Sequence, residues 1–376
     1  MMRLKLIATA TFGLEAVVKR EIQSLGYEIE KTEDGKVTFT GDERAIVRCN
    51  LWLRSADRVL LKMGEFKALE FEELFQQVKG MAWEELIPMD GKFTVTGTSV
   101  KSQLHSVPAC QSIVKKAIVE RMRDYYSIDQ FPETGAEYTV KVTILKDNAV
   151  ITVDTSGAGL HKRGYRVEDV EAPIKETLAA AMVQLSFWKP GRLLIDPCCG
   201  SGTIPIEAAM IGRNIAPGLG RKFASEGWGF IPADIWKEEK KNAFEAMDYD
   251  ADLKIYGGDI DKRAVKAAQA NAEEAGVDDC IEFACKDVAK LTATETGGII
   301  ITNPPYGERI GNQKQIEKIY DTYKKFFADN PSWSLFMVTT DKDVEDRIFG
   351  RKADRRRKLY NGRLEVCYYQ FHGKKE

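Results

Sequence analysis

The chain has 376 residues, of which 44% are hydrophobic and 30% are charged, a composition typical of globular proteins. This length predicts about two or three domains with a substantial core. The net charge of -2 excludes an overall basic surface, so a nucleic-acid partner would have to bind local basic patches.

The cysteines are scattered and form no Cys-x-x-Cys pair: Cys49, Cys110, Cys198, Cys199, Cys280, Cys285 and Cys367. This spacing argues against a zinc site, and a disulfide framework is unusual in so long a chain. The opening MMRLKLIATATFG is too short and polar for a signal peptide, and no apolar run reaches the roughly 18 residues of a membrane helix. We therefore expect a cytoplasmic protein that binds no metal and no membrane.

Residues 1–66 show one complete supersecondary pattern. A strand at 3–9 precedes a helix with apolar helical spacing that ends at Gly26. A hairpin around Asp34 and Gly35 follows, and then a second amphipathic helix (ERAIVRCNLWLRSA) and a strand (DRVLLKMGEF). The order β-α-β-β-α-β predicts a ferredoxin-like unit.

A second α+β module is predicted for about 67–157. It contains a helix (ALEFEELFQQVKGM), a strand (KFTVTGTSV), a strongly amphipathic helix (SVPACQSIVKKAIVERMRDYY) and a hairpin that turns at Asp147-Asn148. The glycine-rich, basic segment GAGLHKRGYR follows and forms a junction to the next domain.

From residue 171 onward, helical and strand segments alternate. The strands are expected in RLLIDP, LKIYGGD, IEFACKD, GGIIITN, WSLFMVTT and LEVCYYQF, with helices between most of them. Such alternation predicts an α/β domain with a mostly parallel, doubly wound sheet covered by helices on both faces. The segment GLGRKFASEGWGFIPADIW is an insertion of loop character within this domain.

The segment DPCCGSGT lies between a strand and a helix. Its glycines, Gly200 and Gly202, allow close approach of the backbone to a ligand, and the helix start supplies free N–H groups. The spacing D-x-x-x-G-x-G differs from the dinucleotide fingerprint G-x-G-x-x-G. Asp196 ahead of the glycines suits a ligand with a positive centre rather than a pyrophosphate.

Two further acids follow predicted strands. Asp259 comes at the end of a strand, where open α/β sheets bind ligands, and can accept hydrogen bonds from ribose hydroxyls. Asp261 is better explained as a helix N-cap. Asp287 follows the next strand and could accept from an adenine amine, although a solvated loop acid explains it equally well.

The strand GGIIIT ends in Asn303-Pro304-Pro305-Tyr306. Proline cannot donate to a sheet ladder, so the two prolines end the strand and leave the Pro304 carbonyl free beside the Asn303 side-chain oxygen. Two fixed acceptors suit an exocyclic NH2 group, and Tyr306 could stack on a flat base. A turn with a core tyrosine is the alternative, and the acidic strand ends argue against it.

Taken together, DPCCGSGT, GGDID, CKD and NPPYGERIG resemble the successive motifs of class I S-adenosylmethionine-dependent methyltransferases that methylate amines. The first half resembles a ferredoxin-like domain followed by a THUMP domain. The whole chain is similar to bacterial THUMP-containing 23S ribosomal RNA guanine-N2-methyltransferases, in the shorter form with one methyltransferase domain. The resemblance implies a ferredoxin-like domain at 1–66, a THUMP RNA-binding domain at 67–157 and a Rossmann-like methyltransferase domain at 158–376.

The resemblance also implies the cofactor, S-adenosylmethionine, and the residues that act on it. Asp259 would hold the ribose, Asp287 the adenine amine with Val288 nearby, and 175–177 would close over the cofactor. The implied cofactor-binding residues are Lys175, Glu176, Thr177, Asp196, Cys198, Gly200, Gly202, Thr203, Asp259, Ile260, Asp287, Val288 and Asn303. The residues implied for catalysis and target-base binding are Asn303, Pro304, Pro305 and Tyr306.

Three basic segments are candidates for RNA binding. They contribute Lys115, Lys116 and Arg121 from the amphipathic helix, Lys162, Arg163 and Arg166 from the junction, and Arg355, Arg356, Arg357, Lys358, Tyr360 and Asn361 from near the end of the chain. A solvated helix face explains the first segment at least as well. The last mixes basic and aromatic residues, as suits phosphate binding and base stacking.

The predicted reaction is direct methyl transfer to the N2 amine of an unpaired or flipped-out guanosine in RNA, with 23S ribosomal RNA or a large-subunit precursor as partner. Adenine-N6 methylation of RNA or DNA stays open, because the Asn-Pro-Pro-Tyr corner suits both amines. A non-catalytic ribosome-assembly factor also stays open. The sequence determines neither the modified nucleotide nor the oligomeric state.

Overall fold

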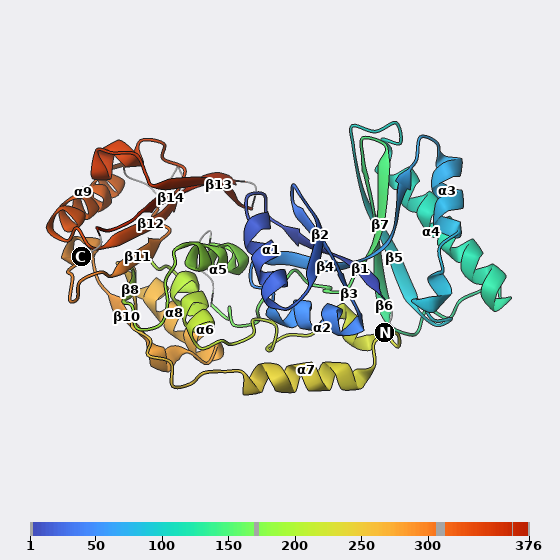
Figure 1. Cartoon of the computed structure of the whole chain (residues 1–376), viewed down its shortest axis with the longest axis horizontal. Helices are drawn as coiled ribbons and strands as arrows, with labels where there is room; N and C mark the ends of the chain where they lie inside the picture. The colour runs from blue at the N-terminus through green and yellow to red at the C-terminus, as the bar shows by residue number, and fades with distance from the viewer. Residues whose placement is uncertain (1–2, 169–172, 306–312, 363, 375–376) are drawn as a thin grey trace. The chain divides into compact units, whose positions relative to one another are not determined.

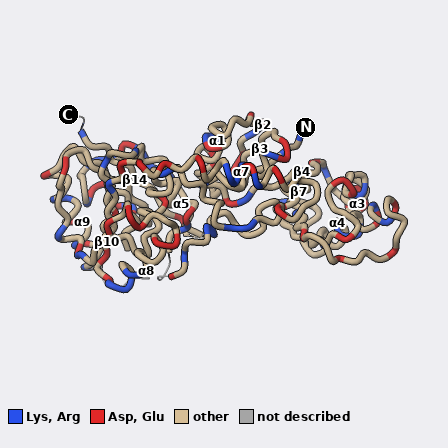
Figure 2. Tube along the Cα trace, turned by 90° about the horizontal axis from the view of Figure 1, so that it is seen from below, with Lys and Arg blue, Asp and Glu red and all other residues tan. Residues whose placement is uncertain are grey.

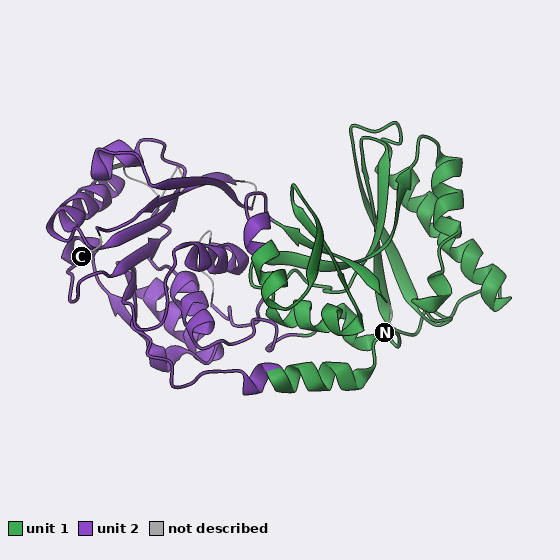
Figure 3. Cartoon of the chain, in the orientation of Figure 1, with its two compact units in different colours: residues 1–10, 19–160, 222–242 green, residues 11–18, 161–221, 243–376 purple. Residues whose placement is uncertain are grey.

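The computed structural model describes residues 3–168, 173–305, 313–362 and 364–374. These residues form two compact units (Figure 3). Unit 1 comprises residues 1–10, 19–160 and 222–242, and unit 2 comprises residues 11–18, 161–221 and 243–376. Unit 1 therefore includes a segment from the middle of the α/β region, and unit 2 includes a short segment from near the start of the chain.

Unit 1 contains one sheet of seven strands, in the order β2-β3-β1-β4-β7-β6-β5 (Figure 1). The strands are β1 (Leu4–Ala10), β2 (Glu28–Glu33), β3 (Lys36–Gly41), β4 (Ala56–Lys67), β5 (Lys92–Val100), β6 (Glu137–Leu145) and β7 (Asn148–Asp154). The helices are α2 (Glu43–Trp52), α3 (Phe71–Lys79) and α4 (Val107–Tyr126), and α1 (Glu15–Ser24) belongs partly to each unit.

The predicted ferredoxin-like and second α+β modules share this sheet. The 12-residue strand β4 is long enough to pair with β1 on one edge and with β7 on the other. Leu61, for example, lies opposite Leu6 of β1 and also opposite Val153 of β7. The backbone hydrogen bonds of β4 thus join the two predicted modules into one continuous structure.

The segment 222–242 belongs to unit 1 and is not only a loop. It contains most of helix α7 (Ala233–Glu245). The Glu239 carboxylate is 2% exposed and accepts hydrogen bonds from Arg44 and Arg48 of α2 at 2.7–2.9 Å. Trp228 stacks on Tyr138 of β6 at 4.8 Å between ring centroids. A buried carboxylate needs such partners, so these ion pairs fix the segment on unit 1.

Unit 2 contains a second seven-stranded sheet, in the order β10-β9-β8-β11-β12-β14-β13. Strands β8 to β12 run parallel, and the β13–β14 hairpin adds antiparallel strands at one edge. The elements are β8 (Leu194–Asp196), β9 (Ile255–Asp259), β10 (Ile281–Cys285), β11 (Ile299–Thr302), β12 (Ser334–Thr339), β13 (Arg355–Asn361), β14 (Leu364–Phe371), α5 (Glu176–Leu185), α6 (Thr203–Gly212), α8 (Lys262–Glu274) and α9 (Gln313–Asp329). The predicted α/β class with a mostly parallel sheet is confirmed.

Both faces of this sheet are covered by helices, as the apolar strand IIIT of β11 illustrates. Ile299 and Ile301 pack into the core with α5, α6 and α8, and Ile300 packs into the core with α9. Successive side chains of a strand point to opposite faces, so a strand buried on both faces must be continuously apolar. The core with α5 and α6 also includes Leu14, which explains why residues 11–18 belong to unit 2.

Both signs of charge occur in each unit. Figure 2 shows Lys and Arg interspersed with Asp and Glu along the whole trace. No helix among the described residues is both long and apolar enough to cross a membrane.

Candidate active site

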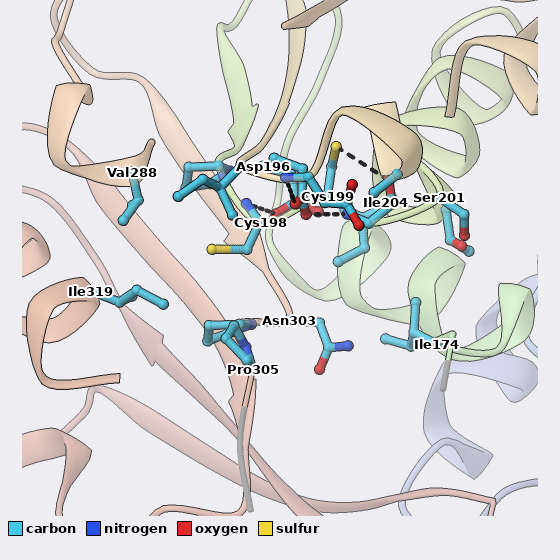
Figure 4. Close-up of a pocket in the computed structure, with 18 of the residues that line it drawn as sticks. Ile174, Asp196, Cys198, Cys199, Ser201, Ile204, Val288, Asn303, Pro305 and Ile319 are labelled. Atoms are coloured by element: carbon cyan, nitrogen blue, oxygen red, sulfur yellow. Dashed lines mark hydrogen bonds between the residues drawn. The ribbon is translucent and has the colours of Figure 1, made fainter. Parts of the chain in front are cut away.

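A cavity of about 780 Å³ lies in unit 2, at the carboxyl ends of its parallel strands (Figure 4). Open α/β sheets bind ligands at this edge. The predicted residues that line the cavity are Asp196, Cys198, Gly200, Thr203, Asp259, Ile260, Asp287, Val288, Asn303, Pro304, Pro305 and Asn361. The structure therefore brings the successive predicted motifs to one site.

Some predicted residues do not line this cavity: Lys175, Glu176, Thr177 and Gly202. Glu176 and Thr177 are buried at the start of α5, while Gly202 is the N-cap of α6. Tyr306 lies outside the described residues.

The glycine loop between β8 and α6 requires glycine at two positions. Gly200 and Gly202 have φ values of 52° and 81°, which side-chain-bearing residues rarely adopt. A Cβ atom on Gly202 would also lie 2.9 Å from the Cβ of Ala268. The loop therefore depends on a left-handed backbone and on close packing against α8.

Asp259, at the end of β9, holds the glycine loop. Its Oδ2 accepts a hydrogen bond from the Gly200 N–H at 3.0 Å, and its Oδ1 accepts from the Asp261 N–H at 2.9 Å. Asp261 caps α8 by accepting from the Arg263 N–H, which confirms its predicted role as an N-cap. Since each carboxylate oxygen can accept more than one bond, Asp259 can still bind a ligand hydroxyl.

Asp196, at the end of β8, is 1% exposed. Its Oδ1 accepts hydrogen bonds from the Thr302 hydroxyl at 2.7 Å and from the Cys198 N–H at 3.2 Å. Burial raises the pKa of Asp196 to about 7, because desolvation disfavours the charged form more than these hydrogen bonds favour it. A cation in the cavity would stabilise the ionised form.

Asp287, after β10, lies beside an apolar surface. Its Oδ2 accepts from Lys318 of α9 at 2.5 Å, and its Oδ1 accepts from the Ala289 N–H at 2.9 Å. The Lys318 ammonium, together with that N–H, lowers the pKa of Asp287 below its ordinary value. Figure 4 shows the neighbouring Val288 and Ile319 on the same side of the cavity. A flat apolar group with an amine at its edge would fit here.

The Asn303 corner at the end of β11 presents an unsatisfied acceptor. The Asn303 Oδ1 is buried and has no hydrogen-bond partner among the described residues. In Figure 4 the Asn303 side chain projects into the cavity next to Pro305. Buried polar atoms in proteins are nearly always paired, and of the residues with such an unpaired atom in the described ranges, Asn303 is the one that lines the cavity. This oxygen is placed to accept from an N–H group of a ligand.

The two basic junction residues Arg163 and Arg166 do not have the positions expected for RNA binding. Arg163 is 4% exposed, and its Nε donates to the fully buried Glu207 at 3.3 Å. Tyr165 also donates to this carboxylate, at 3.0 Å. Because a buried guanidinium cannot reach a phosphate, the prediction for Arg163 was wrong.

Arg166 is half-buried, and its donors bind the protein itself, so its predicted role in RNA binding stays a prediction. The Arg166 guanidinium donates to the Glu176 carboxylate at 2.9 Å and to the Ile174 carbonyl at 3.1 Å. It also donates to the hydroxyls of Ser201 at 3.2 Å and Thr203 at 3.1 Å. Arg166 thus connects the glycine loop to the start of α5. Lys162, in contrast, is exposed.

The other predicted RNA-binding residues differ in exposure and in whether they form ion pairs within the protein. Lys115 and Lys116 are exposed on α4, while Arg121 of the same helix is paired with Glu84. On β13, Arg355 is exposed, Arg356 is paired with Glu345 at 3.5 Å, and Arg357 and Tyr360 are half-buried. Lys358 is exposed and paired with Glu365 at 2.7 Å.

Burial raises the pKa of both thiols in the glycine loop, Cys198 and Cys199, so neither is poised as a thiolate nucleophile. Within the described part of the chain, no group of three or more His, Cys, Asp or Glu residues could hold a metal ion.

Several cavity-lining residues were missed: Ile174, Ser201, Ile204, Lys318, Ile319, Thr340 and Leu364. Thr340 directly follows β12, so the strand-end rule that identified Asp259 would also have identified it. Lys318 and Ile319 carry no local signal, because their role depends on how α9 packs.

Family models match three successive parts of the chain. One described as an RlmL ferredoxin-like domain matches residues 5–60, a THUMP domain matches residues 68–154, and one described as an RMKL-like methyltransferase domain matches residues 163–370.

Two relatives match nearly the whole chain. A putative RNA methyltransferase, YpsC, from Bacillus subtilis is 51% identical over all of this chain and 97% of its own length. The ribosomal RNA large subunit methyltransferase K/L of Syntrophotalea carbinolica is 35% identical over 98% of this chain. This chain spans about half the length of that second relative, since the match covers 53% of it.

Two solved structures have the same fold. SMU.472, a putative methyltransferase complexed with S-adenosylhomocysteine (SAH), is 44% identical over the full length of both chains, with a TM-score of 0.94. A protein of Listeria monocytogenes described as a predicted N6-adenine-specific DNA methylase is 47% identical, with a TM-score of 0.94, over all of this chain and 97% of that chain.

Proposed function

Because the chain belongs to the RMKL-like family of S-adenosylmethionine-dependent RNA methyltransferases, we propose that it methylates the N2 amine of an unpaired guanosine in 23S ribosomal RNA. The family membership supports methyl transfer to RNA. The choice of guanine N2 and of 23S ribosomal RNA is the proposal. The names of the K/L relatives, of which this chain spans about half, favour the large ribosomal subunit.

The residues of the cavity suit S-adenosylmethionine, which supplies a methyl group bound to a positively charged sulfur. Asp259 would accept from the ribose hydroxyls, and Asp287 from the adenine amine beside Val288 and Ile319. Asp196 and the glycine loop would hold the methionine part. These residues fit the cofactor, because a carboxylate that can accept hydrogen bonds stands at or just after the end of each of the three adjacent strands β8, β9 and β10.

The unpaired Asn303 oxygen is the observation that carries the proposed reaction. An exocyclic amine of a base is a poor nucleophile, since its lone pair is delocalised into the ring. Acceptance of its two N–H bonds by the Asn303 side chain and the Pro304 carbonyl would orient the amine and increase electron density on nitrogen. These residues would act by positioning and electrostatics, without covalent catalysis.

The test is transfer of labelled methyl from S-adenosylmethionine to ribosomal RNA from a strain that lacks this protein, followed by nucleoside analysis. The expected product is N2-methylguanosine in 23S RNA, formed about 10²- to 10³-fold more slowly by the Asn303→Ala variant. Label in N6-methyladenosine would contradict the guanine assignment and favour adenine N6 as the amine that accepts the methyl group. Absence of label on free RNA and on ribosomal particles would contradict methyl transfer to ribosomal RNA.

A further inference from the structure

The strand order divides the cavity wall into two parts. The ends of β10, β9 and β8 form one part, which we call the acidic half. In it the carboxylates of Asp287, Asp259 and Asp196 each accept at least two hydrogen bonds from the protein. The ends of β11 and β12 and the β13–β14 hairpin form the other part, which we call the amide half.

The amide half carries a buried acceptor without a partner among the described residues. Asn303, Thr340 and Asn361 are half-buried and line the cavity. The Asn303 Oδ1 is buried and has no partner within the described ranges, while Thr340 and Asn361 are only partly buried beside the same cavity. An unpaired buried acceptor and two further polar side chains on the wall of one cavity suit a polar ligand.

The position of Asn361 is fixed by the hairpin that carries it. Asn361 pairs with Leu364 across the hairpin, and Lys358 and Glu365 form an ion pair at 2.7 Å. Two residues earlier, Leu359 is fully buried in the core beside Leu14. Since side chains alternate along a strand, Asn361 shares the inner face with Leu359. Leu364, 38% exposed, adds an apolar surface to the same wall.

This arrangement matches the edge of guanine. Guanine presents its N2 amine next to an N1–H donor and an O6 acceptor, whereas adenine presents an N1 acceptor next to its N6 amine. Asn303 and Pro304 supply acceptors for the amine. A second amide, which both donates and accepts, can bond N1–H and O6 at the same time.

We propose that Asn361 reads the N1–H and O6 edge of the target guanine while Leu364 covers the face of the base. This assignment rests on the proposed guanine-N2 methylation and extends it to base selection. Thr340 supplies a further hydroxyl to the same wall. A site built to hydrogen-bond a group rejects an analogue that lacks it, by on the order of 100-fold or more.

The test compares two 23S RNA fragments that differ only in the target base, which is guanine in one and 2-aminopurine in the other. 2-Aminopurine keeps the amine but lacks N1–H and O6. We expect the wild-type protein to prefer guanine by about 100-fold in kcat/KM. The Asn361→Leu variant should lose about 30-fold or more on guanine but less than about threefold on 2-aminopurine.

Two controls separate recognition from folding and from RNA affinity. Calorimetric affinity for SAH reports whether the Asn361→Leu cavity is intact. Arg355→Ala, an exposed residue of the same strand, should lower activity on both fragments equally. Equal losses of the Asn361→Leu variant on the two fragments, or no loss on either, would overturn the proposal.

The comparison also distinguishes this proposal from the proposed function. If guanine N2 is not the target, neither fragment will carry a methyl group on the 2-amino group of the target base. If only the role of Asn361 is wrong, the wild-type protein will methylate the guanine fragment, and the ratio between the two fragments will be the same in the variant.

Discussion

The acidic half and the amide half of the cavity differ in what their polar groups contact within the protein. Asp196, Asp259 and Asp287 are held by backbone N–H groups, a hydroxyl and an ammonium. The Asn303 Oδ1 has no partner among the described residues, and the half-buried Thr340 and Asn361 line the same cavity. A cofactor that binds to the acidic half therefore meets groups already fixed in place, which reduces the cost of ordering them on binding.

In the amide half, the polar group that would bind the ligand has no partner in the free protein. An unpaired polar group near the interior destabilises the free protein, and this cost is offset only when a matching ligand arrives. Interactions that form only with the reacting base favour turnover and selectivity rather than cofactor affinity. Substitutions in the two halves should therefore separate into effects on cofactor binding and effects on methyl transfer.

The largest effect is expected for Asn303→Ala. Loss of a fixed group that stabilises the transition state should lower the single-turnover rate by about 10²- to 10³-fold. The affinity for SAH, measured by calorimetry, should change by less than about threefold, because the acidic half is untouched. A parallel loss of SAH affinity would contradict the division between the halves.

Asp196→Asn should remove a pH dependence of stability. The pKa of Asp196 is raised from 3.8 to about 7 in the fold, so the folded protein binds this proton more tightly than the unfolded chain does. As pH rises from about 4 to about 7, the free energy of unfolding of the wild-type protein therefore falls relative to that of the Asp196→Asn variant, by a few kcal/mol in total. Urea unfolding of both proteins across this range measures the difference. A constant difference would show that Asp196 ionises at its ordinary pH.

Asp259→Ala should weaken SAH binding by about 10- to 100-fold. The variant loses the ribose acceptor and also leaves the Gly200 and Asp261 N–H groups without their partner. At saturating cofactor, turnover should stay within about threefold of wild type, which steady-state kinetics can show. Unchanged SAH affinity would refute the assignment of Asp259 to the cofactor.

Two neighbouring basic residues provide a matched pair with smaller effects. Arg166→Ala should weaken SAH binding by about tenfold, because Ser201 of the glycine loop and Thr203 at the start of α6 lose their hydrogen bonds to Arg166. The RNA affinity of this variant should stay the same. Lys162→Ala should leave SAH binding unchanged and reduce RNA affinity a few-fold, with a weaker salt dependence. Filter binding of RNA and calorimetry with SAH test both variants, and a reversed pattern would restore Arg166 as an RNA ligand.

The sequence predicted the strand ends well because two strong rules apply there. Apolar strands end where the chain becomes polar, and parallel strands place those ends at one edge of the sheet, so Asp196, Asp259 and Asn303 could be grouped without a structure. Their roles toward particular ligand groups remain proposals.

Features that depend on packing could not be predicted in the same way. A basic residue in a glycine-rich junction looks the same whether it faces solvent or a buried acid, and the partner of Arg163, Glu207, lies 44 positions away in the sequence. Strand β13 was missed because its sequence, RRRKLYN, lacks an apolar alternation and forms at the sheet edge. The ion pairs of Glu239, which attach 222–242 to unit 1, likewise involve residues distant in sequence.

The interleaving of the two units limits how such a protein can be divided. The chain passes from one unit to the other after residues 10, 18, 160, 221 and 242. No single cut yields two complete units, and a gene fragment that begins at the junction would carry α7 without Arg44 and Arg48. Glu239 would then be an uncompensated acid in an exposed helix. Exchange of the catalytic part between related genes by simple recombination would therefore be disfavoured, and the two units are expected to be inherited together.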